Sequence, residues 1–273
     1  MTAIRDIAHT DLDFGLNELV HQYGERVHVL SDLVAATLLA RLCSPQTTQP
    51  EINRLVRRLY ERLVVAVIND GFPRKLTEVT SRMAADNPRG VYQNVLIDMD
   101  IEVVTVDIAR AGIVPSMVCY ELLNELMNPE KIRQDHLMVS RSVDASEKVS
   151  GATITGGKIG GPIDGRIVLF PDPMGATGSS LSAAMAYYKS EWGNARAMAC
   201  LNLIITPQYI KRILKDHPEA YIYALRLDRG MSAVDVLQTV PGSRWDEETG
   251  LNEKDYIIPG GGGFGELMNN SWV

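Results

Sequence analysis

The sequence contains little cysteine and no long apolar run. Its 273 residues include three cysteines, Cys43, Cys119 and Cys200, which lie far apart and fit neither a zinc-ligand spacing nor a disulfide framework. This spacing argues against a disulfide-stapled fold and predicts buried thiols in a reducing compartment. No apolar run approaches the ~20 residues needed to cross a bilayer, and the N-terminus lacks a signal-peptide pattern. We therefore expect a cytoplasmic protein with no membrane partner.

The sequence also lacks an excess of positive charge and a cluster of histidines. Lysine and arginine number 27 against 34 aspartates and glutamates, and the formal net charge is -7. This balance argues against nucleic acid as a partner. The five histidines show no metal-ligand spacing, so we expect no metal site built from them. An apolar fraction of 45% and a charged fraction of 22% are typical of a globular protein.

Residues 166–189 carry the most informative local pattern. The apolar run 166–170 predicts a buried strand, and a loop rich in small residues with one acid, Asp172, follows it. Apolar residues then recur at helical spacing up to Tyr188. The backbone N–H groups of residues 176–180 would lie at the helix N-terminus, where the helix dipole favours a phosphate. An ordinary strand-to-helix turn with a serine cap is the alternative.

Two further strand-to-loop units are predicted upstream. A β-branched run over residues 101–108 leads into Arg110 and then a helix near 117–127. A charged arginine at the end of a buried strand needs a partner, and both an anionic ligand and a structural salt bridge remain open. A strand at 136–143 leads through Arg141 into a glycine-rich stretch.

That stretch, residues 144–165, contains six glycines, so we expect a mobile loop or an irregular hairpin there. A lid over the site and a disordered insertion both remain open.

The rest of the chain alternates between strands and helices. Strands are predicted at 196–205 and 221–228, and helices at 29–42, 51–70 and 207–216, the last with Thr206 as N-cap and Pro207 as first residue. Residues 74–100 are interpreted as a connecting segment and 229–250 as a surface insertion. We expect an N-terminal extension at 1–27 and one α/β domain at 28–273. The alternation predicts a doubly wound, mainly parallel sheet with its site at the carboxyl ends of the strands.

Three motifs together resemble the uracil phosphoribosyltransferase family. FPDPMGATGSS resembles its ribose-phosphate loop, RAGIVPS resembles its RAG loop, and LNEKDYIIPGGGGFGE resembles its terminal LNEKGYIVPGLGDAGD segment. HPEAYIYALRLD also resembles the segment that precedes this terminus. The motifs occur in the family's order, and the resemblance runs from about residue 27 to residue 264. It implies a type I phosphoribosyltransferase fold with a small C-terminal base-binding hood, here residues 251–266.

The resemblance implies transfer of a phosphoribosyl group from 5-phosphoribosyl-1-pyrophosphate (PRPP) to uracil, giving UMP and pyrophosphate in pyrimidine salvage. Mg²⁺ would arrive bound to PRPP, and a homodimer or higher homo-oligomer is expected. Asp172 would be the catalytic residue that bonds the ribose hydroxyls and favours positive charge on the sugar. The implied PRPP-binding residues are Arg110, Arg141, Asp172, Pro173, Met174, Gly175, Ala176, Thr177, Gly178, Ser179 and Ser180. The implied base-binding residues are Ile257, Gly262, Gly263 and Phe264.

Four positions depart from the family pattern. Gly263 stands where the family has an aspartate that contacts PRPP, and Phe264 replaces an alanine and is expected to add a bulky ring to the base pocket. Gly175 replaces leucine and Ser179 replaces glycine, but both leave the backbone donors available. Two alternatives to a uracil enzyme therefore stay open. One is a paralogue with a different base preference, and the other is a PRPP- or nucleotide-binding regulator with little activity.

Overall fold

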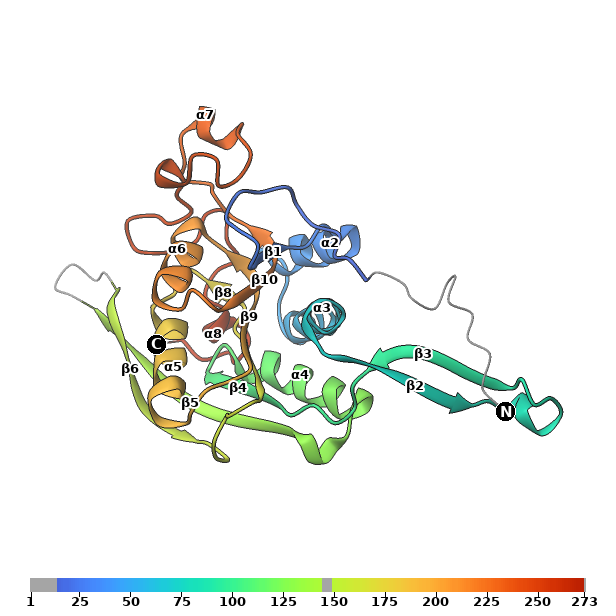
Figure 1. Ribbon diagram of the computed structural model, residues 1–273. Coiled ribbons are helices and arrows are strands. Elements are labelled where there is room, and N and C mark those ends of the chain that lie inside the picture. Colours follow the sequence, from blue (N-terminus) through green and yellow to red (C-terminus); the bar gives the residue numbers. More distant parts are fainter. Residues whose placement is uncertain (1–13, 144–148, 273) are drawn as a thin grey trace.

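The computed structural model describes residues 14–143 and 149–272 (Figure 1). An eight-stranded sheet forms its centre, and its strands are parallel except β6, which runs antiparallel to β5. In spatial order the strands are β1 (Val27–Val29), β10 (Tyr221–Leu227), β9 (Ala197–Ile205), β7 (Ile167–Pro171), β4 (Val103–Ala109), β5 (Ile132–Val143) and β6 (Val149–Lys158), with β8 (Met174–Gly175) paired to β9. The predicted doubly wound, mainly parallel sheet is confirmed.

Helices cover both faces of the sheet (Figure 1). Those on one face are α2 (Leu33–Leu42), α3 (Glu51–Gly71) and α4 (Ile113–Leu126), and those on the other are α5 (Ser179–Glu191) and α6 (Pro207–Asp216). Successive strand residues point to opposite faces. Val103 and Leu169 therefore pack with the first group, while Val104 and Phe170 pack with the second. This two-sided burial explains why the strands read as continuous apolar runs.

Two helices form as the sequence predicts. The apolar stripe of α3 is buried, from Ile52 through Leu59 to Val67. Helix α6 begins at Pro207, and the Thr206 hydroxyl accepts a hydrogen bond from the Tyr209 backbone N–H at 3.0 Å. This side-chain cap satisfies one of the N–H groups that a helix leaves unpaired at its start.

Residues 74–100, which the sequence indicates as a connecting segment, contain regular secondary structure that this interpretation did not include. They form an antiparallel hairpin of β2 (Arg74–Thr80) and β3 (Val91–Ile97), with a 3-10 turn, η1 (Arg82–Ala85), near its tip. The hairpin projects away from the central sheet (Figure 1), and side chains on both of its faces are at least partly exposed. A strand exposed on both sides has no apolar run and no clean alternation, so its sequence does not give the usual strand signal.

The glycine-rich stretch after Arg141 is in part a hairpin. β6 pairs with β5 through a ladder with register shifts after Met138 and after Ser142, which fits the irregular hairpin expected there. Residues 144–148 lie outside the described part of the chain, and the role of a lid stays a prediction.

The segment 229–250 packs against the N-terminal part of the described chain. It contains α7 (Val234–Leu237) and η3 (Trp245–Glu247); the remaining short helices are η2 (Pro129–Lys131) and α8 (Phe264–Leu267). The buried Tyr23 hydroxyl hydrogen-bonds Glu248, whose other carboxylate oxygen accepts from Arg229 at 2.9 Å. The insertion and the residues before β1 are therefore held by one buried polar network.

Cys119 and Cys200 are buried, as expected, and Cys43 is half-buried; all three are free thiols. No described helix combines the length and apolar character needed to cross a membrane.

Candidate functional site

Asp172 directly follows β7, at the carboxyl edge of the sheet, where α/β proteins bind ligands. Its backbone N–H donates to Leu201 O at 3.0 Å, and its carbonyl accepts from Asn202 Nδ2 at 2.6 Å. Its carboxylate oxygen Oδ1 accepts from the Met174 N–H at 3.1 Å. Both the backbone N–H and the backbone carbonyl of Asp172 are therefore hydrogen-bonded to residues of β9. These bonds fix the position of the Asp172 Cα, from which the carboxylate side chain extends.

Helix α6 holds the loop from the other side. The Tyr209 hydroxyl donates to Asn202 Oδ1 at 2.7 Å, and the Thr206 hydroxyl donates to the Ala176 carbonyl at 2.7 Å. Burial raises the pKa of Tyr209, so this hydroxyl keeps the proton that it donates. Thr206 thus caps α6 and holds the loop with a single side chain.

Gly175 is glycine because two side chains occupy the space beside it. A Cβ at this position would lie 2.9 Å from Ile205 Cγ2 and 3.0 Å from the Tyr209 ring. The leucine that the family carries here would not fit against Tyr209. The departure at Gly175 is a packing change below the loop and leaves the loop's backbone donors in place.

Residues 176–180 lie at the start of α5, as the sequence predicts, and their binding of a phosphate stays a prediction. Gly178 has φ +80° as the N-cap of α5, a backbone conformation that favours glycine. No described residue accepts a hydrogen bond from the backbone N–H of Thr177, Gly178 or Ser180. The Thr177 and Ser179 hydroxyls are 3.2 Å apart, on the same turn. Free amides, hydroxyls and the positive end of a helix dipole together favour an anion here.

Arg110 follows β4 and contacts the C-terminal segment. Its guanidinium donates to Ser271 Oγ at 2.8 Å and to Ser271 O at 3.1 Å, and it lies 3.5 Å from Glu266 Oε1. The structure contains the salt bridge that was one expectation for this arginine, and its binding of an anionic ligand stays a prediction. Gly112 makes the tight turn possible, because a Cβ there would lie 2.7 Å from the Ile108 nitrogen.

Glu266 lies across the backbone of Gly263. A Cβ at Gly263 would be only 2.4 Å from Glu266 Oε2. The space that a side chain at residue 263 would enter is therefore filled by the Glu266 carboxylate, which also faces Arg110. The carboxylate of Glu266 therefore occupies the place where an acidic side chain at residue 263 would lie.

Arg141 lies in β5 with its backbone opposite Ala152, but its side chain lies outside the described part of the structure. Its role in PRPP binding stays a prediction.

The hood is anchored to the end of β10. The Gly260 N–H donates to Asp228 Oδ2 and the Gly260 carbonyl accepts from Arg226 Nη2, both at 2.8 Å. Arg226 and Asp228 also form an ion pair with each other at 2.7 Å. Ile257 is buried in the apolar core beneath the hood, so its side chain stabilises the hood.

The expectation that Phe264 narrows a base pocket is wrong. Its ring is 2% exposed and belongs to the core on the α3 side of the sheet. The ring fits there because Gly261 has no side chain; a Cβ at Gly261 would lie 2.8 Å from Phe264 Cε2. Within the described residues, the N–H groups of Gly262 and Gly263 have no hydrogen-bond acceptor. At residues 262–264 the hood therefore presents backbone groups rather than the Phe264 ring.

Three residues that support the site were not recognised from the sequence as functional: Asn202, Tyr209 and Glu266. Asn202 gives a signal in retrospect, because a polar residue inside the buried run of β9 needs a partner. Tyr209 and Glu266 give no such signal in the sequence. A tyrosine in a helix and a glutamate near a C-terminus are common and do not by themselves indicate a functional role.

The fold defines an α/β protein in which a helix start with free amides, an acid and an arginine lie at the carboxyl edge of a doubly wound sheet. The family model for uracil phosphoribosyltransferase matches residues 29–243. The chain belongs to the uracil phosphoribosyltransferase family.

Curated relatives carry the same name over part of their length. The chain is 36% identical to the uracil phosphoribosyltransferase of Caldanaerobacter subterraneus over 111 residues, which is 41% of this chain and 42% of that protein. It is 34% identical to that of Agrobacterium fabrum over 106 residues, 39% of this chain and 40% of that protein. The matched region thus spans about two fifths of these relatives' length.

A solved structure, the AQ2163 protein from Aquifex aeolicus, has the same fold. It matches with a TM-score of 0.68 at 20% identity, covering 90% of this chain and 99% of that chain.

Proposed function

We propose that this protein is a uracil phosphoribosyltransferase, converting PRPP and uracil to UMP and pyrophosphate. The observation that carries the proposal is the Asp172–Ser180 loop. An acid at the end of β7 precedes a helix start whose amides at Thr177, Gly178 and Ser180 lack acceptors among the described residues. These features support the proposal, because one short segment would then supply both an anion cradle and a carboxylate for the sugar.

In this proposal the cradle binds the 5′-phosphate, and Asp172 accepts hydrogen bonds from the ribose hydroxyls. Uracil N1 forms a bond to C1′ while the bond from C1′ to the pyrophosphate oxygen breaks, and the N1 proton is released. Positive charge develops on the sugar as pyrophosphate leaves, and the fixed Asp172 carboxylate stabilises it. Arg110 binds the pyrophosphate, for which it exchanges its contacts with Glu266 and Ser271.

Mg²⁺ enters as part of the PRPP substrate. The described residues contain no group of three or more acidic, histidine or cysteine side chains that could hold the ion alone. Pyrophosphate oxygens and water are ligands that Mg²⁺ prefers, so they complete its coordination.

Uracil is recognised by the hood. Its edge alternates donors and acceptors, which suits pairing with the backbone groups of Gly262 and Gly263. Gly263 stands where the family has an aspartate. Of the two alternatives to a uracil enzyme, this difference favours a paralogue with a different acceptor base. The Phe264 ring is buried in the core and is not part of this recognition.

A homodimer or higher oligomer belongs to the same proposal. The β2–β3 hairpin exposes apolar side chains at Leu76, Val79 and Tyr92. A two-stranded hairpin of this kind is only marginally stable alone in water, so a second copy covering it would stabilise it. Light scattering on the purified protein tests this, and a monomer at micromolar concentration would contradict it. The cytoplasmic location stays a prediction.

The test mixes the protein with PRPP, Mg²⁺ and one base at a time from uracil, cytosine, adenine and hypoxanthine, and measures monophosphate formation. We expect UMP with uracil alone. Asp172→Asn is expected to lower turnover at least about 100-fold, the loss typical for a group that stabilises transition-state charge. Asp246→Asn, which removes an exposed partner of Lys211, is the matched control. Measurable PRPP binding without product from any base would support the regulator alternative instead.

A further inference from the structure

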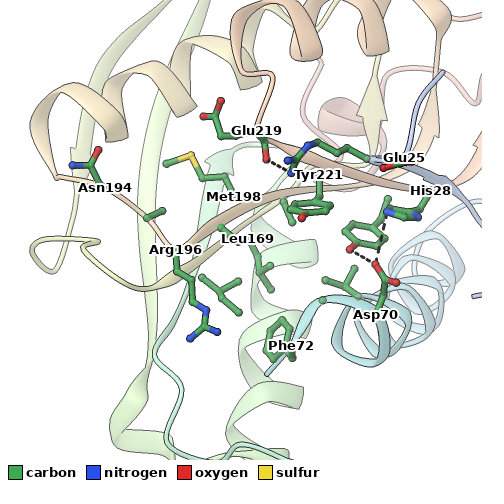
Figure 2. A pocket seen from close by; sticks show the side chains of 18 of the residues that line it. Glu25, His28, Asp70, Phe72, Leu169, Asn194, Arg196, Met198, Glu219 and Tyr221 are labelled. Atoms are coloured by element: carbon green, nitrogen blue, oxygen red, sulfur yellow. Dashed lines mark hydrogen bonds and ion pairs between the residues drawn. The ribbon is translucent and has the colours of Figure 1, made fainter. Parts of the chain in front are cut away.

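A cavity of about 860 Å³ lies at the amino edge of the sheet, opposite the Asp172 loop. The first residues of three parallel strands, Ile167, Ala197 and Tyr221, line it. Since parallel strands run the same way, their starts lie at the edge away from Asp172. The cavity also reaches the end of α3 at Phe72, and Figure 2 shows it between that helix and the strands. It is therefore separate from the proposed PRPP site.

Small residues leave this space open. Ala197 and Ala199 point from β9 toward α3, and neither fills the gap between sheet and helix. Gly71 at the end of α3 is equally small; a Cβ there would lie 3.3 Å from the Tyr223 hydroxyl. The floor is apolar, with Leu169 from β7. The volume falls within the range of about 300–1,000 Å³ that is typical of small-molecule sites.

Nearly parallel rings form one wall of the cavity. The His28 and Tyr223 rings are 4.7 Å apart at 18°, and the Tyr221 and Tyr223 rings are 6.5 Å apart at 22°. Arg26 lies over Tyr221, with its guanidinium carbon 4.9 Å from the ring centre. Because Tyr223 is 2% exposed and Arg26 already lies over Tyr221, this wall is formed by packed rings rather than by an open ring face. An aromatic ligand gains there from burial and from edge-to-face contact with the rings.

The charges at the cavity are mostly paired within the protein. Asp70 accepts from the Tyr223 hydroxyl at 2.7 Å, and Lys189 forms an ion pair with Glu219. Arg196 differs, because no described side chain forms a hydrogen bond or ion pair with its guanidinium. Glu25 also lacks such a partner, but it lies at the opposite end of the cavity from Arg196 (Figure 2). An anionic group is therefore favoured at the Arg196 end.

We propose that this cavity binds a planar aromatic anion, with its ring against the Tyr221 wall and its carboxylate, sulfonate or phosphate on Arg196. The site does not depend on the proposed activity.

The test uses two fluorescent dyes that share one ring skeleton. 1-Anilinonaphthalene-8-sulfonate carries the anion and N-phenyl-1-naphthylamine lacks it. Ala197→Leu puts a larger side chain into the cavity and is expected to weaken both dyes at least about tenfold, because burial of the rings is lost. Arg196→Gln is expected to weaken the sulfonate about tenfold and leave the neutral dye within about twofold, since only the charged hydrogen bond is removed.

Arg58→Gln is the matched control, because Arg58 is an exposed arginine of α3 that does not line the cavity. It should change neither dye, and saturating PRPP should not compete. Displacement of the sulfonate by benzoates identifies a carboxylate ligand, and displacement by UMP or AMP identifies a phosphate. Equal dye affinity in Ala197→Leu and wild type, or equal weakening of both dyes by Arg196→Gln, would overturn the proposal. So would the failure of both anion classes to displace the dye at millimolar concentration.

Discussion

The Thr206 hydroxyl links the start of α6 to the loop that contains Ala176. Thr206→Val tests the two hydrogen bonds of this hydroxyl without changing the shape of the side chain. Valine keeps the volume but removes the hydroxyl that accepts from the Tyr209 N–H at 3.0 Å and donates to the Ala176 carbonyl at 2.7 Å. Loss of the cap costs about 1 kcal/mol and loss of the second bond about 0.5–1.5 kcal/mol. The free energy of unfolding should fall by about 2 kcal/mol, which lowers Tm by about 4–8 °C in a chain of this size.

Calorimetry measures the change in Tm, and steady-state kinetics measures the KM for PRPP. Because the Ala176 carbonyl is no longer held, the cradle amides lose their fixed position, and we expect this KM to rise about tenfold or more. Thr206→Ser should restore both values. Thr37→Val is the control, since Thr37 is an exposed helical threonine whose hydroxyl bonds only its own helix, at Leu33 O.

An unchanged Tm in Thr206→Val would refute the two hydrogen bonds. A lowered Tm with an unchanged KM for PRPP would refute the placement of the 5′-phosphate on this loop.

Three further changes follow from packing and charge. Gly175→Ala places a methyl group against the Tyr209 ring and should destabilise the protein by about 1–3 kcal/mol, as measured by urea unfolding. Arg110→Ala should raise the KM for PRPP and weaken pyrophosphate inhibition while the Tm changes by less than about 3 °C, because the guanidinium is half-exposed and its ion pair with Glu266 contributes little. Phe264→Ala should lower the free energy of unfolding by about 3–5 kcal/mol, because the ring is buried in the core.

A different result would contradict each of these three predictions. Wild-type stability in Gly175→Ala would mean that the loop is not packed against α6. An unaltered KM in Arg110→Ala would remove this arginine from pyrophosphate binding. A small effect of Phe264→Ala on stability with a large effect on the KM for uracil would return its ring to the base pocket.

The sequence predicts well where local chemistry decides the structure. Thr206 and Pro207 mark the start of α6, and the stripe from Ile52 to Val67 marks α3, because caps and apolar periodicity act within a few residues. The position of Asp172 follows from the same logic, since an apolar run must end before a polar loop begins.

The sequence predicts poorly where distant residues meet. Phe264 is buried in a core whose other members come mostly from elements far away in the sequence. The glycine at 175 depends on Tyr209, which lies on another element. The contact of Glu266 with Arg110 joins the end of the chain to the end of β4. The cavity beside Ala197 exists because several small residues coincide in space. None of these features leaves a periodic or adjacent pattern in the sequence.

The hairpin 74–97 is not predicted from the sequence, for a different reason. Its strands are exposed on both faces, so neither burial nor alternation marks them.

The central claim is that the loop ending at Ser180 binds the 5′-phosphate of a ribose. Isothermal titration calorimetry with ribose 5-phosphate tests it directly in the wild type and in Gly178→Val. Gly178 has φ +80°, and a Cβ there would lie 3.3 Å from Arg212, so valine must move the cradle. The account predicts saturable binding of ribose 5-phosphate to the wild type, none of ribose at the same concentrations, and loss of binding in Gly178→Val. Equal binding of ribose 5-phosphate by both proteins, or its absence in the wild type, would contradict the account.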